Sequence, residues 1–145
     1  MGEATYYTNS DYNNIFEHLF ENWKEIKTDY GKAFSKLEDN LATYKKMTSN
    51  ITDYTGVDPV ETDFFTLRYV KNKNGYSNIV KVDIKKDKLK YTSEKAQLIF
   101  VDEAAHFNTA LMMLLDAYAD HVGGTIIAAS DSDQSGTSDK VDIQP

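Results

Sequence analysis

Apolar residues recur every three or four positions from about residue 12 to residue 54, a spacing that predicts an amphipathic helix. A heptad seam of this kind is how one helix meets another. Bulky aromatic residues at such positions also pack on a sheet or a second helix of their own domain. Both alternatives stay open, a partner interface and an intramolecular core. The residues of this stripe are Phe16, Trp23, Tyr30, Leu37, Tyr44 and Ile51.

Gly31 lies in the middle of this pattern and lowers the helix propensity by about 1 kcal/mol relative to Ala. The segment around Gly31 could therefore be a kink, or a tight turn between two shorter antiparallel helices. The stripe keeps its phase through Gly31, which favours one long or kinked helix. Gly56 and Pro59 predict its end. An unbroken helix of about 40 residues would span about 60 Å, so we expect part of it to project and contact a neighbour.

The middle of the chain has the alternation of a β-sheet. In the second segment, Val80, Val82 and Ile84 share one face. Asn74-Gly75 predicts a type I′ hairpin turn, in which both residues have positive φ. The expected strands are residues 64–70, 76–84 and 89–92, which would form a three-stranded antiparallel meander.

A second, strongly apolar helix is expected to begin at Thr92 or Ser93 and to end at Gly123-Gly124. Residues 1–10 are predicted to be irregular, and the segment TIIAA after the glycines suggests a short strand. The positions that define the second helix, again three and four apart, are Phe100, Ala104, Phe107, Leu111, Leu114, Tyr118 and Val122.

These elements together predict an α+β fold with a long or kinked N-terminal helix, a three-stranded antiparallel meander, an apolar C-terminal helix and a polar tail. A chain of 145 residues fits one domain. We expect that domain to cover residues 1–129 and residues 130–145 to form a flexible tail, because the tail is polar and of low complexity.

The net charge of −7 is distributed unevenly. Residues 1–62 carry −5, residues 63–95 carry +5 and residues 96–145 carry −7. A basic sheet with interleaved tyrosines can bind single-stranded nucleic acid, keep strand edges soluble or dock on an acidic neighbour. The tyrosines are Tyr69, Tyr76 and Tyr91. The basic patch consists of Arg68, Lys71, Lys73, Lys81, Lys85, Lys86, Lys88 and Lys90, followed by Lys95.

Candidate chemistry is sparse. The chain has no Cys, no phosphate-binding loop and no nucleophile elbow, so we expect neither enzymatic activity nor a cofactor. Glu103 and His106 have an E-x-x-H spacing, but a di-iron site needs a second such pair. Asp116 and Asp120 could share a cation, and a solvated helix face explains them more simply. We therefore expect no metal site.

The N-terminal segment lacks the regions of a signal peptide, and no apolar run is long enough to span a membrane. We expect a cytoplasmic protein that does not bind membranes. The leading hypothesis is a non-enzymatic assembly protein that contacts other protein subunits, with a phage or virus particle as one setting. The alternatives are a small acidic binding or inhibitor protein and a weak nucleic-acid-binding module.

Overall fold

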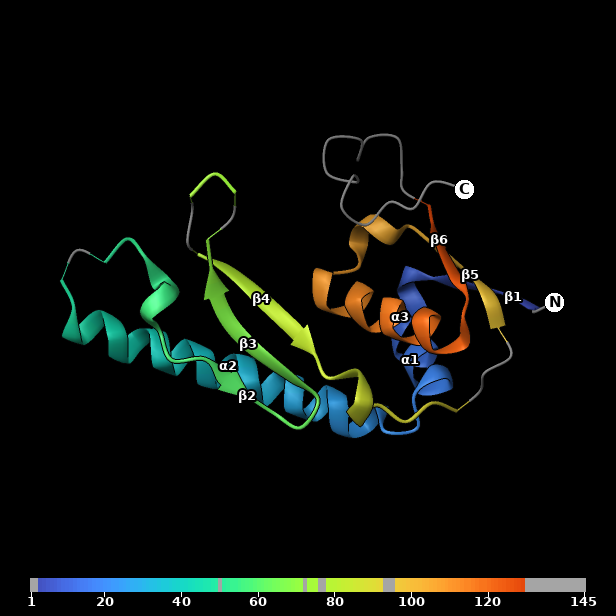
Figure 1. The fold of residues 1–145 in the computed structure, drawn as a ribbon, viewed down its shortest axis with the longest axis horizontal. Coiled ribbons are helices and arrows are strands. Elements are labelled where there is room, and N and C mark those ends of the chain that lie inside the picture. Colours follow the sequence, from blue (N-terminus) through green and yellow to red (C-terminus); the bar gives the residue numbers. More distant parts are fainter. Residues whose placement is uncertain (1–2, 50, 72, 76–77, 93–95, 130–145) are drawn as a thin grey trace. The chain divides into compact units, whose positions relative to one another are not determined.

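The computed structural model describes residues 3–49, 51–71, 73–75, 78–92 and 96–129 and has the predicted α+β class (Figure 1). The chain divides into two compact units. The terminal unit contains the chain up to Trp23 and from Lys90 on, and the central unit is Lys24–Leu89. The single domain over residues 1–129 stays a prediction, and the expected tail lies outside the described residues. None of the described helices is long and apolar enough to cross a membrane.

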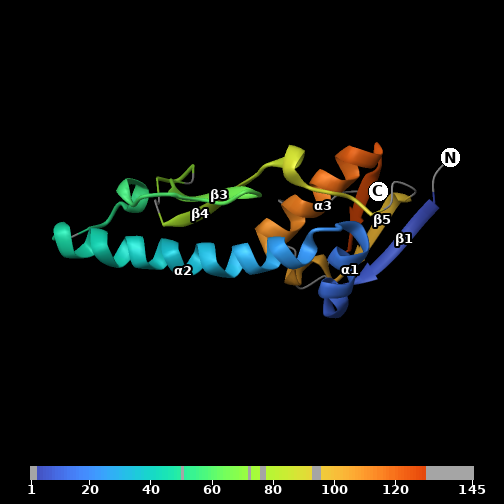
Figure 2. The same ribbon diagram turned by 90° about the horizontal axis from the view of Figure 1, so that it is seen from below.

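The terminal unit is built on a parallel sheet with the strand order β1-β5-β6. Its register pairs Tyr6 with Phe100 and Phe100 with Ile127. Two helices, α1 and α3, lie on the same side of β1 and β5 (Figure 2). The elements are β1 (Glu3–Thr8), α1 (Tyr12–Leu19), β5 (Ala96–Asp102), α3 (Thr109–Val122) and β6 (Thr125–Ala128).

Aromatic rings join the two helices of the terminal unit in its core. Phe16 of α1 and Tyr118 of α3 are both fully buried. Phe20 follows α1 and contacts both, with ring centroids 6.1 Å from Phe16 and 6.2 Å from Tyr118. Because burying one such side chain contributes about 1.5–3 kcal/mol, this cluster holds α1 and α3 together on one face of the sheet.

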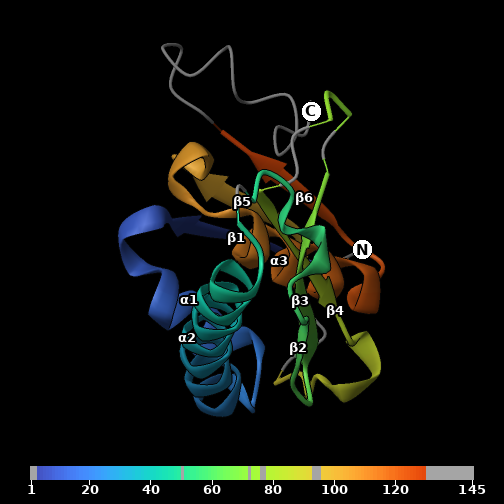
Figure 3. The same cartoon turned by 90° about the vertical axis from the view of Figure 1, so that its left-hand side faces the viewer.

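The central unit packs an antiparallel sheet, in the order β2-β3-β4, against α2. Figure 3 looks nearly along α2 and shows these strands on one side of it. Tyr30 of α2 lies edge-on to Phe65 of β3, with ring centroids 5.8 Å apart. The predicted alternation is confirmed, since Leu67 and Val82 are paired and both buried. The elements are α2 (Trp23–Met47), β2 (Val60–Glu61), β3 (Phe65–Val70) and β4 (Ile79–Ile84).

The first helix is broken, but not at Gly31. α1 ends at Leu19, and Phe20 takes an extended conformation that forms an isolated antiparallel bridge with Tyr91. α2 then runs through Gly31 and ends at Met47, well before Gly56. The apolar residues of α1 and α2 keep the same spacing of three and four across the break, because each helix buries its apolar stripe. Periodicity alone therefore does not reveal the break.

The predicted meander is correct for its hairpin but wrong for its third strand. Val60–Glu61 pairs with β3, whereas the predicted strand at residues 89–92 contributes only the Tyr91 bridge. The type I′ turn is also wrong: of the two predicted turn residues only Gly75 has a positive φ, at 87°. The connection spans residues 71–78 instead of two residues.

The second helix begins later than predicted. Residues 96–102 form β5, and α3 begins after Asn108, whose side chain accepts a hydrogen bond of 2.9 Å from the Leu111 backbone N–H. Its predicted end is confirmed, because Gly123 adopts a left-handed conformation with φ 69°. The short strand of TIIAA is confirmed as β6, while the expectation of an irregular N-terminus is wrong, since residues 3–8 form β1.

Candidate interaction surface

One face of the parallel sheet carries exposed apolar side chains. Ile99 and Val101 of β5 point toward the helices and are buried, so Leu98 and Phe100, which alternate with them, point the other way. Tyr6 is 64% exposed and Leu98 is 41% exposed. The rings of Tyr6 and Phe100 stack with centroids 6.0 Å apart. We call this surface the bare face, and it consists of Ala4, Tyr6, Leu98, Phe100, Thr125 and Ile127.

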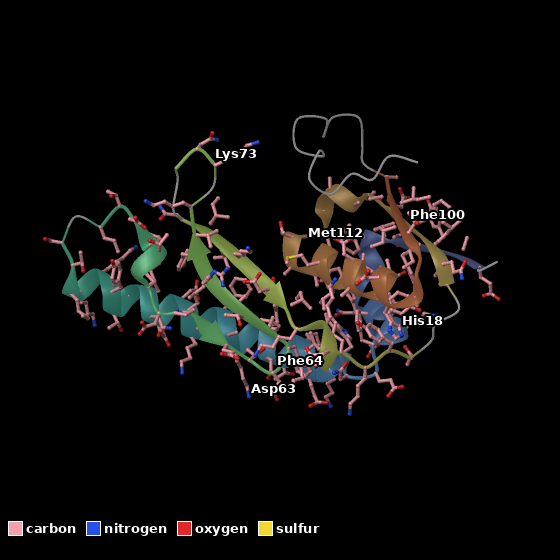
Figure 4. The ribbon with its side chains drawn as sticks, viewed as in Figure 1. His18, Asp63, Phe64, Lys73, Phe100 and Met112 are labelled. Carbon is pink, nitrogen blue, oxygen red and sulfur yellow. The ribbon has the colours of Figure 1, made fainter. Side chains whose placement is uncertain are left out.

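The strand order explains why this face is bare. Both crossovers, from β1 to β5 and from β5 to β6, step across the sheet in the same direction. Crossovers between parallel strands are almost always right-handed, so helices that follow successive steps in one direction collect on one face. Figure 4 shows Phe100 on the side of the sheet away from α3. Among the described residues of the terminal unit, no helix covers that side.

The strand order β1-β5-β6 also lacks the feature at which ligands usually bind to a parallel sheet. Such sites lie where the strand order reverses, and here it does not reverse. The hollow beside β1 and α1 has a volume of about 450 Å³ and is lined by Tyr7, Asp11, Asn14 and His18 among others. Burial raises the pKa of the Tyr7 hydroxyl to about 12, with a smaller contribution from Tyr118. The rings of Tyr7 and His18 lie 6.5 Å apart, and the Asn14 amide donates a hydrogen bond of 3.5 Å to Asp11.

The two units differ in charge. The terminal unit has 3 basic and 13 acidic residues, a net charge of −10. The central unit has 13 basic and 10 acidic residues, a net charge of +3. On the bare face itself no side chain is charged, and acids stand at its borders: Glu3 at the start of β1, and Asp102 and Glu103 at the end of β5.

The structure divides the predicted helix stripe into buried and partly exposed members. Phe16, Trp23 and Leu37 are buried within their own chain, which favours the intramolecular alternative for these three. Tyr30, Tyr44 and Ile51 are half-buried, and Ile51 lies beyond the end of α2. Contact of the stripe with a partner stays a prediction.

Several members of the predicted basic patch contact carboxylates. Arg68 and Lys81 both contact Asp83, at 2.9 and 3.8 Å. Lys71 lies 3.2 Å from Asp53, and Lys85 contacts Glu61. Lys73 stands at the tip of the hairpin loop (Figure 4), Lys86 and Lys88 are exposed beyond β4, and Lys90 belongs to the terminal unit. Lys95 lies outside the described residues.

Two carboxylates near this patch have lowered pKa values. Hydrogen bonds from Thr55, with a smaller contribution from Lys71, lower the pKa of Asp53 to about 2. A hydrogen bond from Lys85 lowers the pKa of Glu61. Both acids are therefore ionised at neutral pH and compete with phosphate groups for the neighbouring lysines.

Two of the three tyrosines of the patch pack against other aromatic rings. Tyr69 packs edge-on against Tyr54, with ring centroids 5.2 Å apart. Tyr91 stacks on His121 in the terminal unit, with centroids 3.8 Å apart. Tyr76 lies outside the described residues.

The remaining candidates lie apart from the bare face or at its border. Glu103 and His106 approach within 3.7 Å, but on a 3₁₀ turn after β5 instead of the predicted helix, and Glu103 has a positive φ of 56°. Asp116 and Asp120 are exposed, as predicted for a solvated helix face. The described residues contain no group of three or more His, Asp or Glu side chains that could hold a metal ion.

Sequence reasoning missed the bare face. The segment EATYYT is rich in Thr and Tyr, which favour strands, and this signal could have identified β1. Leu98 and Phe100 were instead assigned to a helix. No protein-family model matches the chain, and neither a curated protein nor a solved structure is significantly similar to it.

Proposed function

We propose that this chain is a non-enzymatic subunit of a protein assembly and works through contacts with other subunits. The observation that carries the proposal is the bare face. Parallel sheets are covered on both faces in nearly all proteins, and exposed apolar patches mark interaction sites. Tyr6 and Leu98, together with Phe100 and Ile127, form such a patch on an otherwise highly charged unit. A virion assembled from subunits made in the cytoplasm is one setting for this function.

The acidic terminal unit favours a second candidate. With a net charge of −10, it could occupy a basic site on a target as a monomeric binding or inhibitor protein. Nucleic-acid binding has less support, because the chain has a net charge of −7 and because Tyr69 and Tyr91 pack against other rings.

Light scattering across a concentration series separates the first two candidates. The test variant is Tyr6→Ser/Leu98→Gln, which removes the two most exposed apolar side chains of the bare face. The matched control is Met47→Gln, because Met47 is 77% exposed and lies at the end of α2. Circular dichroism confirms that each variant is folded.

We expect the wild-type chain to self-associate as its concentration rises. The test variant should associate at least about tenfold more weakly, since burying one Leu contributes about 1.5–3 kcal/mol and 1.4 kcal/mol corresponds to tenfold. The control should match the wild type. A wild-type chain that stays monomeric at every concentration would reject self-assembly and favour the binding-protein candidate.

A further inference from the structure

The outward face of the central sheet has both apolar and basic side chains. Phe65, Leu67 and Val82 point toward α2, so the alternate residues of β3 and β4 point outward. Val70 and Ile79 are paired at the loop end of the hairpin, and Ile79 is 46% exposed. We call this surface the hairpin face, and it consists of Thr66, Arg68, Val70, Ile79, Lys81 and Asp83.

Positive charge surrounds the apolar pair. Arg68 and Lys81 form the register pair next to Val70 and Ile79, and they share the single carboxylate of Asp83. The loop that follows Val70 adds Lys71 and Lys73, of which Lys73 is exposed at the tip (Figure 4). An apolar contact with a basic surround is thus present on the hairpin face, and an apolar contact with an acidic border is present on the bare face.

We propose that the bare face of one copy docks on the hairpin face of a second copy, in a head-to-tail contact. This inference rests on the proposed assembly function and names its partner surface. Tyr6 and Phe100 would meet the side chains of Val70 and Ile79 from the other copy. Asp102 and the acids near it would face Arg68 and Lys81.

Charge selects this arrangement over a symmetric pairing of two bare faces. In a symmetric dimer two terminal units of −10 each would face one another, whereas head-to-tail docking brings −10 against +3. The apolar area is also small. Three strands about 4.8 Å apart and four to six residues long cover about 200–300 Å², against about 800 Å² per partner in a stable interface. The surrounding charges therefore contribute a large share of the contact.

A head-to-tail contact joins two different surfaces, so each copy keeps one free surface of each kind. The assembly therefore continues beyond two copies, as a ring or a filament. A symmetric dimer uses one surface twice and stops at two copies.

The deciding experiment mixes two blocked variants. Leu98→Gln blocks the bare face and leaves the hairpin face intact, and Ile79→Asp blocks the hairpin face and leaves the bare face intact. Each variant alone should be monomeric at concentrations where the wild type forms higher oligomers. Their equimolar mixture should form one contact between unlike copies and stop at a heterodimer, measured by light scattering or native mass spectrometry. Met47→Gln should behave as wild type, and circular dichroism should show native folding for all.

Salt gives an independent readout. Between about 0.05 and about 0.5 M salt the Debye length falls from about 14 to about 4 Å, so wild-type association should weaken at least about tenfold. Three outcomes would overturn the head-to-tail contact while leaving the assembly function standing. These are an Ile79→Asp variant that still associates like the wild type, a mixture that stays monomeric, and association that strengthens with salt. A wild-type chain that never associates would reject both proposals.

Discussion

The two sheets of this protein have the same number of strands, and each packs one face against helices. Their outward faces differ in chemical character. Each has three strands and buries one face against helices of its own unit. The antiparallel sheet turns Thr66, Arg68, Lys81 and Asp83 outward at its centre. The parallel sheet turns Tyr6 and its apolar neighbours outward.

The difference shows how sheet topology and surface chemistry are linked. Antiparallel sheets tolerate water on one face, and the alternation of apolar and polar residues in β3 and β4 fits that setting. A parallel sheet normally gains its second cover from helices of the same chain. In the terminal unit the unreversed strand order places both described helices on one side, so the other face of the sheet has no helix of that unit on it.

Substitutions on opposite sides of the parallel sheet give the largest expected contrast. Phe16→Ala should lower the free energy of unfolding by about 3–5 kcal/mol, because it leaves a cavity in a fully buried cluster. Tyr6→Ala on the bare face should change it by less than about 1 kcal/mol. Urea denaturation at a dilution where the chain is monomeric measures both. Equal losses would show that the two faces are not packed differently.

A glycine in the terminal unit gives the next largest effect. A Cβ added to Gly124 would lie 2.4 Å from the backbone carbonyl oxygen of Gln97, where α3 returns to the sheet. Gly124→Ala should therefore destabilise the chain by about 1–3 kcal/mol through overpacking. Thermal unfolding followed by circular dichroism would test this, and an unchanged midpoint would contradict the close approach of the two segments.

A glycine in the central unit gives the smallest effect, with the opposite sign. Gly31 is exposed in the middle of α2, and an added Cβ would have no atom within 4 Å. Gly31→Ala should stabilise the chain by up to about 1 kcal/mol, because Ala loses less backbone entropy in a helix. The same thermal assay measures it, with Gly124→Ala as the matched comparison. A lower midpoint would indicate that α2 needs the glycine for a reason other than packing.

The parts of the fold that were predicted correctly are those whose contacts join residues close together in the sequence. The hairpin of β3 and β4 joins segments only a few residues apart, and its alternation is visible in the sequence. The end of α3 follows from Gly123, which can adopt the left-handed conformation. The parallel sheet was missed because its strands are far apart in the sequence. β1 pairs with β5, so that Glu3 lies opposite Ala96, and no local sequence pattern indicates a strand partner at that distance.

The start of the second helix was misplaced for a different reason. Phe100, Ala104 and Phe107 happen to continue the three-and-four spacing of α3. A short apolar run fits a buried strand as well as a helix, and periodicity does not separate them. The bare face was missed as a consequence, since Leu98 and Phe100 acquire their outward direction only from the alternation of a strand.

The position of the central unit within the chain also bears on how the protein forms during synthesis. Lys24–Leu89 is one uninterrupted stretch, so all strands of its sheet leave the ribosome together. β1 leaves first, and its partner β5 follows only after that whole stretch. Pairing over such a separation is slow compared with local contacts, and domains generally fold as units as they emerge. The central unit should therefore fold first. Phe16 and the rest of α1 would stay without their packing partners in α3 until the end of the chain has been synthesised.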